Sequence, residues 1–187
     1  MKTVLKCSIA FALLSTLQMV SAAPIVLGTA NLLGSNETPP TGSPATGSAL
    51  LTLNGDMLTV SVTYSGLTGG TPSAAHIHCC TAPGTNTGVT VGFTGFPVTT
   101  SGTYLSTFNL LDVSVYNAAF VTANGGTAAT AETVLLAGIN SGKSYVNIHD
   151  ATFPGGEIRG FVTPEPASIA LMGLGLGFFA VLRKRLT

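Results

Sequence analysis

Residues 49–64 read ALLTLNGDMLTVSVTY. From position 58 to position 64, apolar residues alternate strictly with hydroxyl residues, which is the period of a β-strand with one buried face. Asn54 and Gly55 separate this run from the apolar run at 49–53, and an Asn-Gly pair in that place indicates a β-hairpin. The predicted core-facing residues of the second strand are Leu58, Val60, Val62 and Tyr64.

Short strand-like runs continue on both sides of this hairpin, separated by Gly, Pro, Ser or Thr. They are Ile25 to Leu33, Ala74 to Cys79, Val89 to Phe93, Tyr104 to Leu110, Tyr145 to His149 and Glu157 to Val162. Seven or eight short strands predict an antiparallel β-sandwich, with Ile77, Val146 and Ile158 also in the core. Residues 115–123 and 131–140 predict two short helices, the second with Thr130 as its cap and Gly142 after its end.

The composition excludes several classes of protein. Only 7% of the 187 residues are charged, whereas about a quarter is usual for a soluble domain, so a typical intracellular enzyme is excluded. Residues 23–163 hold two basic and six acidic side chains, a formal charge of −4. With no basic patch and a net charge of zero for the whole chain, nucleic acid is not an expected partner.

The N-terminus has the layout of a secretory signal peptide. Lys2 and Lys6 precede an apolar stretch at 9–20, and the small residues Ser21 and Ala22 provide a cleavage site. We therefore predict a signal helix at 1–22, recognised by the export machinery and removed by signal peptidase after Ala22.

The C-terminus predicts a short membrane helix. Residues 167–182 carry no charge, lie between a Pro-Glu-Pro segment and a basic tail, and would rise about 24 Å as a helix, against roughly 30 Å for the hydrocarbon core. Because basic residues prefer the cytoplasmic side, both chain ends would lie there during transient insertion and the central domain would lie across the inner membrane. The expected sorting residues are Pro164, Glu165, Pro166, Arg183, Lys184 and Arg185.

This order of features at 164–187 resembles the PEP-CTERM sorting signal of Gram-negative bacteria. The resemblance implies recognition by an exosortase, cleavage near the Pro-Glu-Pro segment, and release to the cell surface or an extracellular polysaccharide matrix such as a biofilm.

Two segments of the central domain echo each other. Residues 76–84 and 147–155 are identical at five of nine positions, and they contain His76, His78 and His149, which are all the histidines of the chain. Matched strand-to-turn units of this kind predict two strands of similar role, lying side by side.

The same segments resemble the CHRD domain, a module first noticed in chordin and widespread in exported bacterial proteins. The resemblance rests on residues 73–78, 145–149 and 154–160, with 37–40, 64–67 and 137–142 in the family's order. It implies a Greek-key or immunoglobulin-like β-sandwich over 23–163 that acts as a binding or structural module. Cys79 and Cys80 stand where the family commonly has a glycine-containing turn.

The three histidines are candidate metal ligands. In a strand, His76 and His78 project from one face about 6.6 Å apart along the backbone, and His149 on a neighbouring strand would bring a third imidazole. Imidazole suits Zn²⁺ or Cu²⁺, and Asp150 and Glu157 are the expected partners that orient the rings. The alternative is a structural network in which the histidines bond backbone groups and Asp150, Glu157 and Arg159 complete the polar contacts.

Cys79 and Cys80 are adjacent and are the only cysteines left once the signal peptide is removed. A bridge between neighbours closes a strained ring, so we expect reduced thiols or a disulfide to another chain in preference to a Cys79–Cys80 bridge or to thiolate metal ligands.

Three functional hypotheses follow from the sequence. The first is an exported, exosortase-processed, non-enzymatic module that binds exopolysaccharide or surface proteins. The second is a Zn or Cu binding or redox domain built on the histidines and cysteines, and the third is a structural spacer. No catalytic residues are predicted, because no Gly-x-Ser-x-Gly elbow or comparable arrangement occurs.

Overall fold

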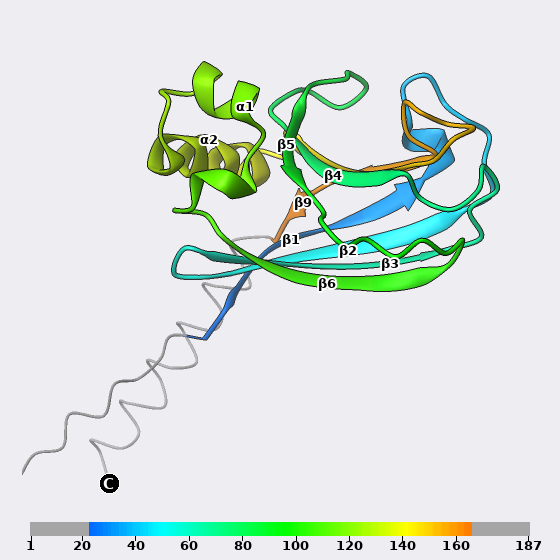
Figure 1. Ribbon diagram of the computed structural model, residues 1–187, viewed down its shortest axis with the longest axis horizontal. Coiled ribbons are helices and arrows are strands. Elements are labelled where there is room, and N and C mark those ends of the chain that lie inside the picture. Colours follow the sequence, from blue (N-terminus) through cyan, green and yellow to red (C-terminus); the bar gives the residue numbers. More distant parts are fainter. Residues whose placement is uncertain (1–22, 166–187) are drawn as a thin grey trace, which may run out of the picture.

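The computed structural model describes residues 23–165, and this part of the chain forms an antiparallel β domain with two α-helices beside it (Figure 1). The strands are β1 Ile25–Leu33, β2 Thr46–Asn54, β3 Met57–Ser65, β4 Ala74–Cys79, β5 Val89–Gly92, β6 Gly102–Asn109, β7 Ser144–His149, β8 Ile158–Phe161 and β9 Thr163–Pro164. The helices are α1 Ala118–Ala123 and α2 Ala128–Asn140, with 3-10 turns η1 Gly34–Asn36 and η2 Val113–Val115.

The predicted hairpin is confirmed as β2 and β3. Asn54 pairs with Met57, so the turn itself consists of Gly55 and Asp56. Gly55 adopts a φ of 58°, which glycine reaches without a steric penalty and which a tight two-residue hairpin turn requires at its first position.

The strands form one continuous curled antiparallel sheet, which confirms the predicted mainly β, antiparallel class but not the division into the two sheets of a Greek-key or immunoglobulin-like sandwich. Its order is β5-β4-β7-β8-β1-β2-β3-β6, with β9 also paired to β1. The two halves meet at β1, whose Leu33 pairs with Arg159 of β8 while its whole length pairs with β2. Strand β1 therefore belongs to both halves of the sheet. The sheet folds over on itself, and Figure 1 shows β4 and β5 above β1, β2, β3 and β6.

One apolar core lies between the two halves of the sheet. The residues predicted to face it are all at most 2% exposed: Leu58, Val60, Val62, Tyr64, Ile77, Val146 and Ile158. Ser61, which lies between two of them on β3, is half-buried on the opposite face. The alternation read from the sequence therefore places the side chains correctly.

Both helices are present, but each begins at a different residue from the one predicted. Asn117 caps α1 by accepting a hydrogen bond from the amide of Ala119. Thr127, not Thr130, caps α2, and the two threonines form a reciprocal capping box. Helix α2 turns Ala131, Leu135 and Ile139 into the core and covers one end of it.

The predicted signal helix at 1–22 and the predicted membrane helix at 167–182 with its basic tail lie outside the described residues. Within residues 23–165, no helix is long and apolar enough to cross a membrane.

Candidate functional site

The candidate site lies on the face of β4, β7 and β8 that points away from the core. Strands β4 and β7 are neighbours, as the sequence echo predicts, with His76 opposite Asn147 and Ala74 opposite His149. Side chains alternate across a strand, so His76, His78 and His149 share this outer face while Ile77 and Val146 point into the core.

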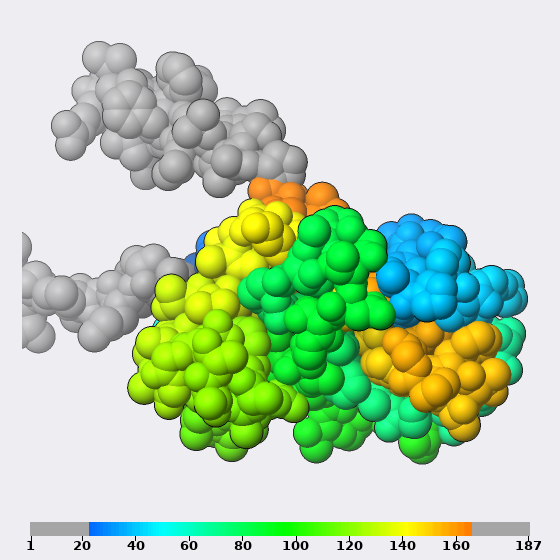
Figure 2. All heavy atoms as spheres, turned by 90° about the horizontal axis from the view of Figure 1, so that it is seen from above, coloured from blue at the N-terminus to red at the C-terminus, as the bar shows by residue number. Residues whose placement is uncertain are grey.

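Three loops cover the outer face. They follow β1, β4 and β7, and Figure 2 shows these blue, green and orange segments gathered on one side of the molecule. Asn86 joins two of them by donating a hydrogen bond of 3.0 Å to the carbonyl oxygen of Thr38.

The structure brings the three histidines together. One ring nitrogen from each lies within 4.8 Å of the others. The ring centroids are 5.5 Å apart for His76 and His78, 5.0 Å for His76 and His149, and 6.2 Å for His78 and His149. His78 is buried, whereas His76 and His149 are half-buried.

Backbone carbonyls fix the orientation of two rings. Nδ1 of His78 lies 2.8 Å from the carbonyl oxygen of Thr87, and Nδ1 of His149 lies 2.9 Å from that of Pro154. A carbonyl oxygen can only accept, so both rings carry a proton on Nδ1. In the neutral ring of His78, Nε2 is left with a lone pair, whereas Nε2 of His149 lies 2.9 Å from another acceptor, Oδ1 of Asn147.

Two nitrogens of the cluster are buried without a hydrogen-bond partner among the described residues: Nδ1 of His76 and Nε2 of His78. Burial, together with the neighbouring His149 and His78, lowers the pKa of His76 to about 4. Burial also lowers the pKa of His78 and His149, although their bonds to Thr87 and Pro154 act in the opposite direction. All three imidazoles are therefore neutral near pH 7, the form that coordinates a metal.

Beside the histidines lies a stack that the sequence analysis missed. The rings of His78 and Tyr145 are nearly parallel, at 4° and 4.6 Å between centroids, and the guanidinium carbon of Arg159 lies 4.3 Å from the Tyr145 centroid. Arg159 forms a buried ion pair with Glu37, at 2.6 Å from Nη2 to Oε2. No pattern in the sequence near Arg159 indicates that Glu37 is its partner.

Asp150 and Glu157 do not orient the histidines, and this corrects the sequence expectation. Oδ1 of Asp150 accepts from the amides of Thr152 and Phe153, each at 2.8 Å, which closes the turn after β7. Glu157 accepts from the amide and hydroxyl of Thr68 at 2.7 and 2.8 Å, and from Ser43 at 2.6 Å. These carboxyl groups hold loops in place.

The two carboxyl groups titrate as a pair. Burial raises the pKa of Asp150, and the nearby carboxylate of Glu157 adds to that rise. Burial alone would raise the pKa of Glu157 as well, but the hydrogen bonds that it accepts, among them those from Ser43 and Thr68, lower it to about 2. The folded domain therefore binds a proton more tightly on Asp150 than on Glu157.

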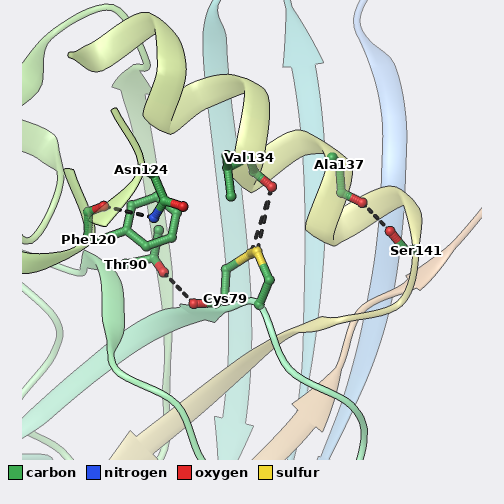
Figure 3. Close-up of a disulfide and its surroundings, with 8 residues drawn as sticks. Cys79, Thr90, Phe120, Asn124, Val134, Ala137 and Ser141 are labelled. Atoms are coloured by element: carbon green, nitrogen blue, oxygen red, sulfur yellow. Dashed lines mark hydrogen bonds between the residues drawn. A yellow bond between two sulfur atoms is a disulfide. The ribbon is translucent and has the colours of Figure 1, made fainter. Parts of the chain in front are cut away.

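Cys79 and Cys80 form a disulfide with each other, which corrects the expectation of reduced thiols or an interchain bridge (Figure 3). Cys79 is only 4% exposed at the end of β4, so it cannot reach another chain, and Cys80 is its nearest partner. The sulfurs lie 3.9 and 3.5 Å from the carbonyl oxygen of Val134 in α2. They contact this oxygen without donating to it, because disulfide sulfurs carry no proton.

Residues 28–162 match the CHRD domain family. The chain belongs to this family. Residues 162–185 match the PEP-CTERM protein-sorting motif, so both resemblances read from the sequence are confirmed. No curated protein shows a significant match, and no solved structure shows one.

The sorting motif begins where the CHRD domain ends, and it implies export through the envelope of a Gram-negative bacterium and processing by an exosortase. The histidine cluster, the Glu37–Arg159 pair and the vicinal disulfide all lie inside the CHRD domain. Of the predicted sorting residues, only Pro164 and Glu165 fall within the described part of the chain, and Pro164 pairs with Gly28 in β1.

Proposed function

We propose that the protein is an exosortase-processed component of the cell surface or extracellular matrix, and that its CHRD domain is a non-enzymatic binding or structural module. The PEP-CTERM motif supports the first part, since it marks the chain as a sorted, exported protein.

The observation that carries the proposal is the pairing of the two ends of the domain. Strand β9 pairs with β1, with Gly28 opposite Pro164 and Thr29 opposite Thr163. Both ends of the folded domain therefore lie side by side, at the start of β1. This arrangement suits a domain that is held at one membrane by a segment at each end before processing.

Two further features suit an exported structural module. A disulfide persists in oxidising compartments, and Cys79 and Cys80 form one. The buried polar groups of the outer face hold loops together: Glu37 with Arg159, and Glu157 with Ser43 and Thr68. Contacts of this kind stabilise the loops of a structural or binding module, and they do not depend on any catalytic role.

Mass spectrometry of the native protein tests the proposal. The mature chain should begin near Ala23 and end near Pro166, and it should be found in the surface or matrix fraction. In a strain that lacks its exosortase, the C-terminal segment should remain attached. A Glu165→Ala variant should accumulate unprocessed, whereas a Glu132→Gln control in α2 should be processed normally.

A mature fraction that retains Met1 and Arg183 would disprove the export part of the proposal. Hydrolytic or redox turnover by the purified chain, lost on substitution of a residue of the outer face, would disprove the non-enzymatic part.

A further inference from the structure

The histidine cluster has the orientation that a metal site requires. Metal-binding histidines usually donate the proton of their other ring nitrogen to a carbonyl or carboxylate, which fixes the ring and its tautomer. His78 and His149 do so through Nδ1, to Thr87 and Pro154, and in its neutral form each keeps a lone pair on Nε2. The loops after β4 and β7 therefore hold both rings ready to coordinate.

The free lone pairs are buried in the cluster. His78 is only 6% exposed, and its Nε2 has no hydrogen-bond partner among the described residues. Nδ1 of His76 is also a buried atom without a hydrogen-bond partner there. A buried polar atom without a partner is destabilising, so native structures rarely retain one without a ligand, water or function.

Asn147 adds an independent sign of a cation site. Its amide nitrogen and Oε1 of Glu37 both lie beside Gly156, so its Oδ1 faces the other way, 2.9 Å from Nε2 of His149. With the His149 proton on Nδ1, two acceptors face each other at this distance. A positive ion beside both atoms removes the conflict, because Nε2 then donates its lone pair to the ion.

We propose that His76, His78 and His149 form a mononuclear site for Zn²⁺ or Cu²⁺, the divalent ions that imidazole nitrogen prefers. At metal–nitrogen distances of 2.0–2.1 Å, tetrahedral ligands lie about 3.3 Å apart. The three nitrogens lie within 4.8 Å of one another, so binding an ion requires them to draw together by about 1.5 Å at most. Strands β4 and β7 already hold their backbones side by side.

Solvent can reach the proposed site from the side of His76 and His149. His76 lines a pocket of about 530 Å³ together with Gly92, Thr94 and Tyr116, and His149 is half-buried. A site with three protein ligands and solvent access keeps one exchangeable position. This inference goes beyond the proposed function and is independent of it, since export and processing can be normal whether or not the domain binds metal.

Titration of the tag-free, full-length chain with ZnCl₂ and with CuSO₄ tests the site. We expect one ion per chain by calorimetry, and for Cu²⁺ an electron paramagnetic resonance spectrum with nitrogen couplings. His76→Ala and His149→Ala should each weaken binding at least tenfold, with His149→Ala at least as severe because His149 alone joins β7 to the site. An Asp112→Asn control, in an exposed residue, should bind as the wild type does.

His76 and His149 are half-buried, so these variants should fold, and circular dichroism verifies this. Binding of one ion but not the other, lost in both variants, supports the site and identifies its metal. No uptake of either ion at neutral pH overturns the proposal, and so does uptake that both folded variants retain.

Discussion

Arg159 of β8 binds Glu37, 122 residues earlier in the chain, through both Nε at 2.7 Å and Nη2 at 2.6 Å from the same carboxylate oxygen. Both side chains are almost completely buried. The ion pair ties the loop after β1 to the outer face of the sheet, beside the histidine cluster. Burial raises the pKa of Glu37 even though Arg159 opposes the rise, so the cost of removing these charges from water is high.

Breaking this pair from one side should destabilise the domain strongly. Glu37→Gln or Arg159→Met leaves a buried charge without its partner, and we expect a loss of about 3–5 kcal/mol in the free energy of unfolding. The double variant should lose clearly less than the two single losses combined, because it leaves neither charge behind. Urea unfolding of all four proteins measures the coupling, and additive losses would show that the pair does not act as a unit.

The sequence predicts features that depend on local periodicity. Alternation at 58–64 places Val60 and Val62 in the core, and the echo between 76–84 and 147–155 places β4 beside β7. The shared face of His76, His78 and His149 follows from these two facts. Each of these features needs only the two-residue period of a strand and one correct pairing.

Contacts between distant loops leave no such pattern. Glu37 lies in a proline-rich loop, and nothing in its neighbourhood indicates that Arg159 is its partner. The sequence groups Glu157 with Arg159 in one polar network, yet Glu157 bonds to Thr68 and Ser43, while Arg159 pairs with Glu37. The two halves of the sheet are joined where Leu33 of β1 pairs with Arg159 of β8. The disulfide between Cys79 and Cys80 follows from the burial of Cys79, which keeps it away from other chains. Neither feature has a local pattern in the sequence.

Alternation on β3 makes a stability prediction. Val60→Ala and Val62→Ala should each cost about 1–3 kcal/mol, because both side chains are fully buried and their loss leaves a partial cavity. Ser61→Ala should change the free energy of unfolding by less than about 0.5 kcal/mol, since Ser61 lies on the other face. Denaturant unfolding compares the three, and equal effects would contradict the assigned register.

Glu157 should make the domain sensitive to acid. Its pKa is about 2 in the folded chain, below the ordinary 4.5 of a glutamate, so the folded state favours the ionised form. The resulting stabilisation, about 3 kcal/mol at most, is present above pH 4.5 and is lost as the pH falls toward 2. Asp150 has a raised pKa and acts in the opposite sense: its contribution is present at low pH and is lost as the pH rises through its folded pKa.

Unfolding measured from pH 7 to pH 2 separates these contributions. Glu157→Gln should lower stability at neutral pH and flatten the decline below pH 4.5. Asp56→Asn removes a charge from the exposed hairpin turn and serves as the control. A decline as steep in Glu157→Gln as in the wild type would show that another carboxylate is responsible.

Gly138 of α2 provides a prediction in which two effects have opposite signs. Helix propensity favours Gly138→Ala by about 1 kcal/mol. A methyl group at this position, however, would overlap Sγ of both Cys79 and Cys80, and it would lie 3.0 Å from Oγ of Ser144. Overpacking a buried position costs typically about 1–3 kcal/mol, so we expect Gly138→Ala to lower the melting temperature.

A variant without the two sulfurs is the control for this prediction. When Cys79 and Cys80 are both replaced by alanine, most of the atoms that a methyl group at Gly138 would meet are gone. In that background Gly138→Ala should be neutral or stabilising, because only the gain in helix propensity remains. Thermal unfolding of the four proteins decides the matter. If Gly138→Ala destabilises both backgrounds equally, the sulfurs are not what requires glycine here, and Ser144 becomes the contact to test next.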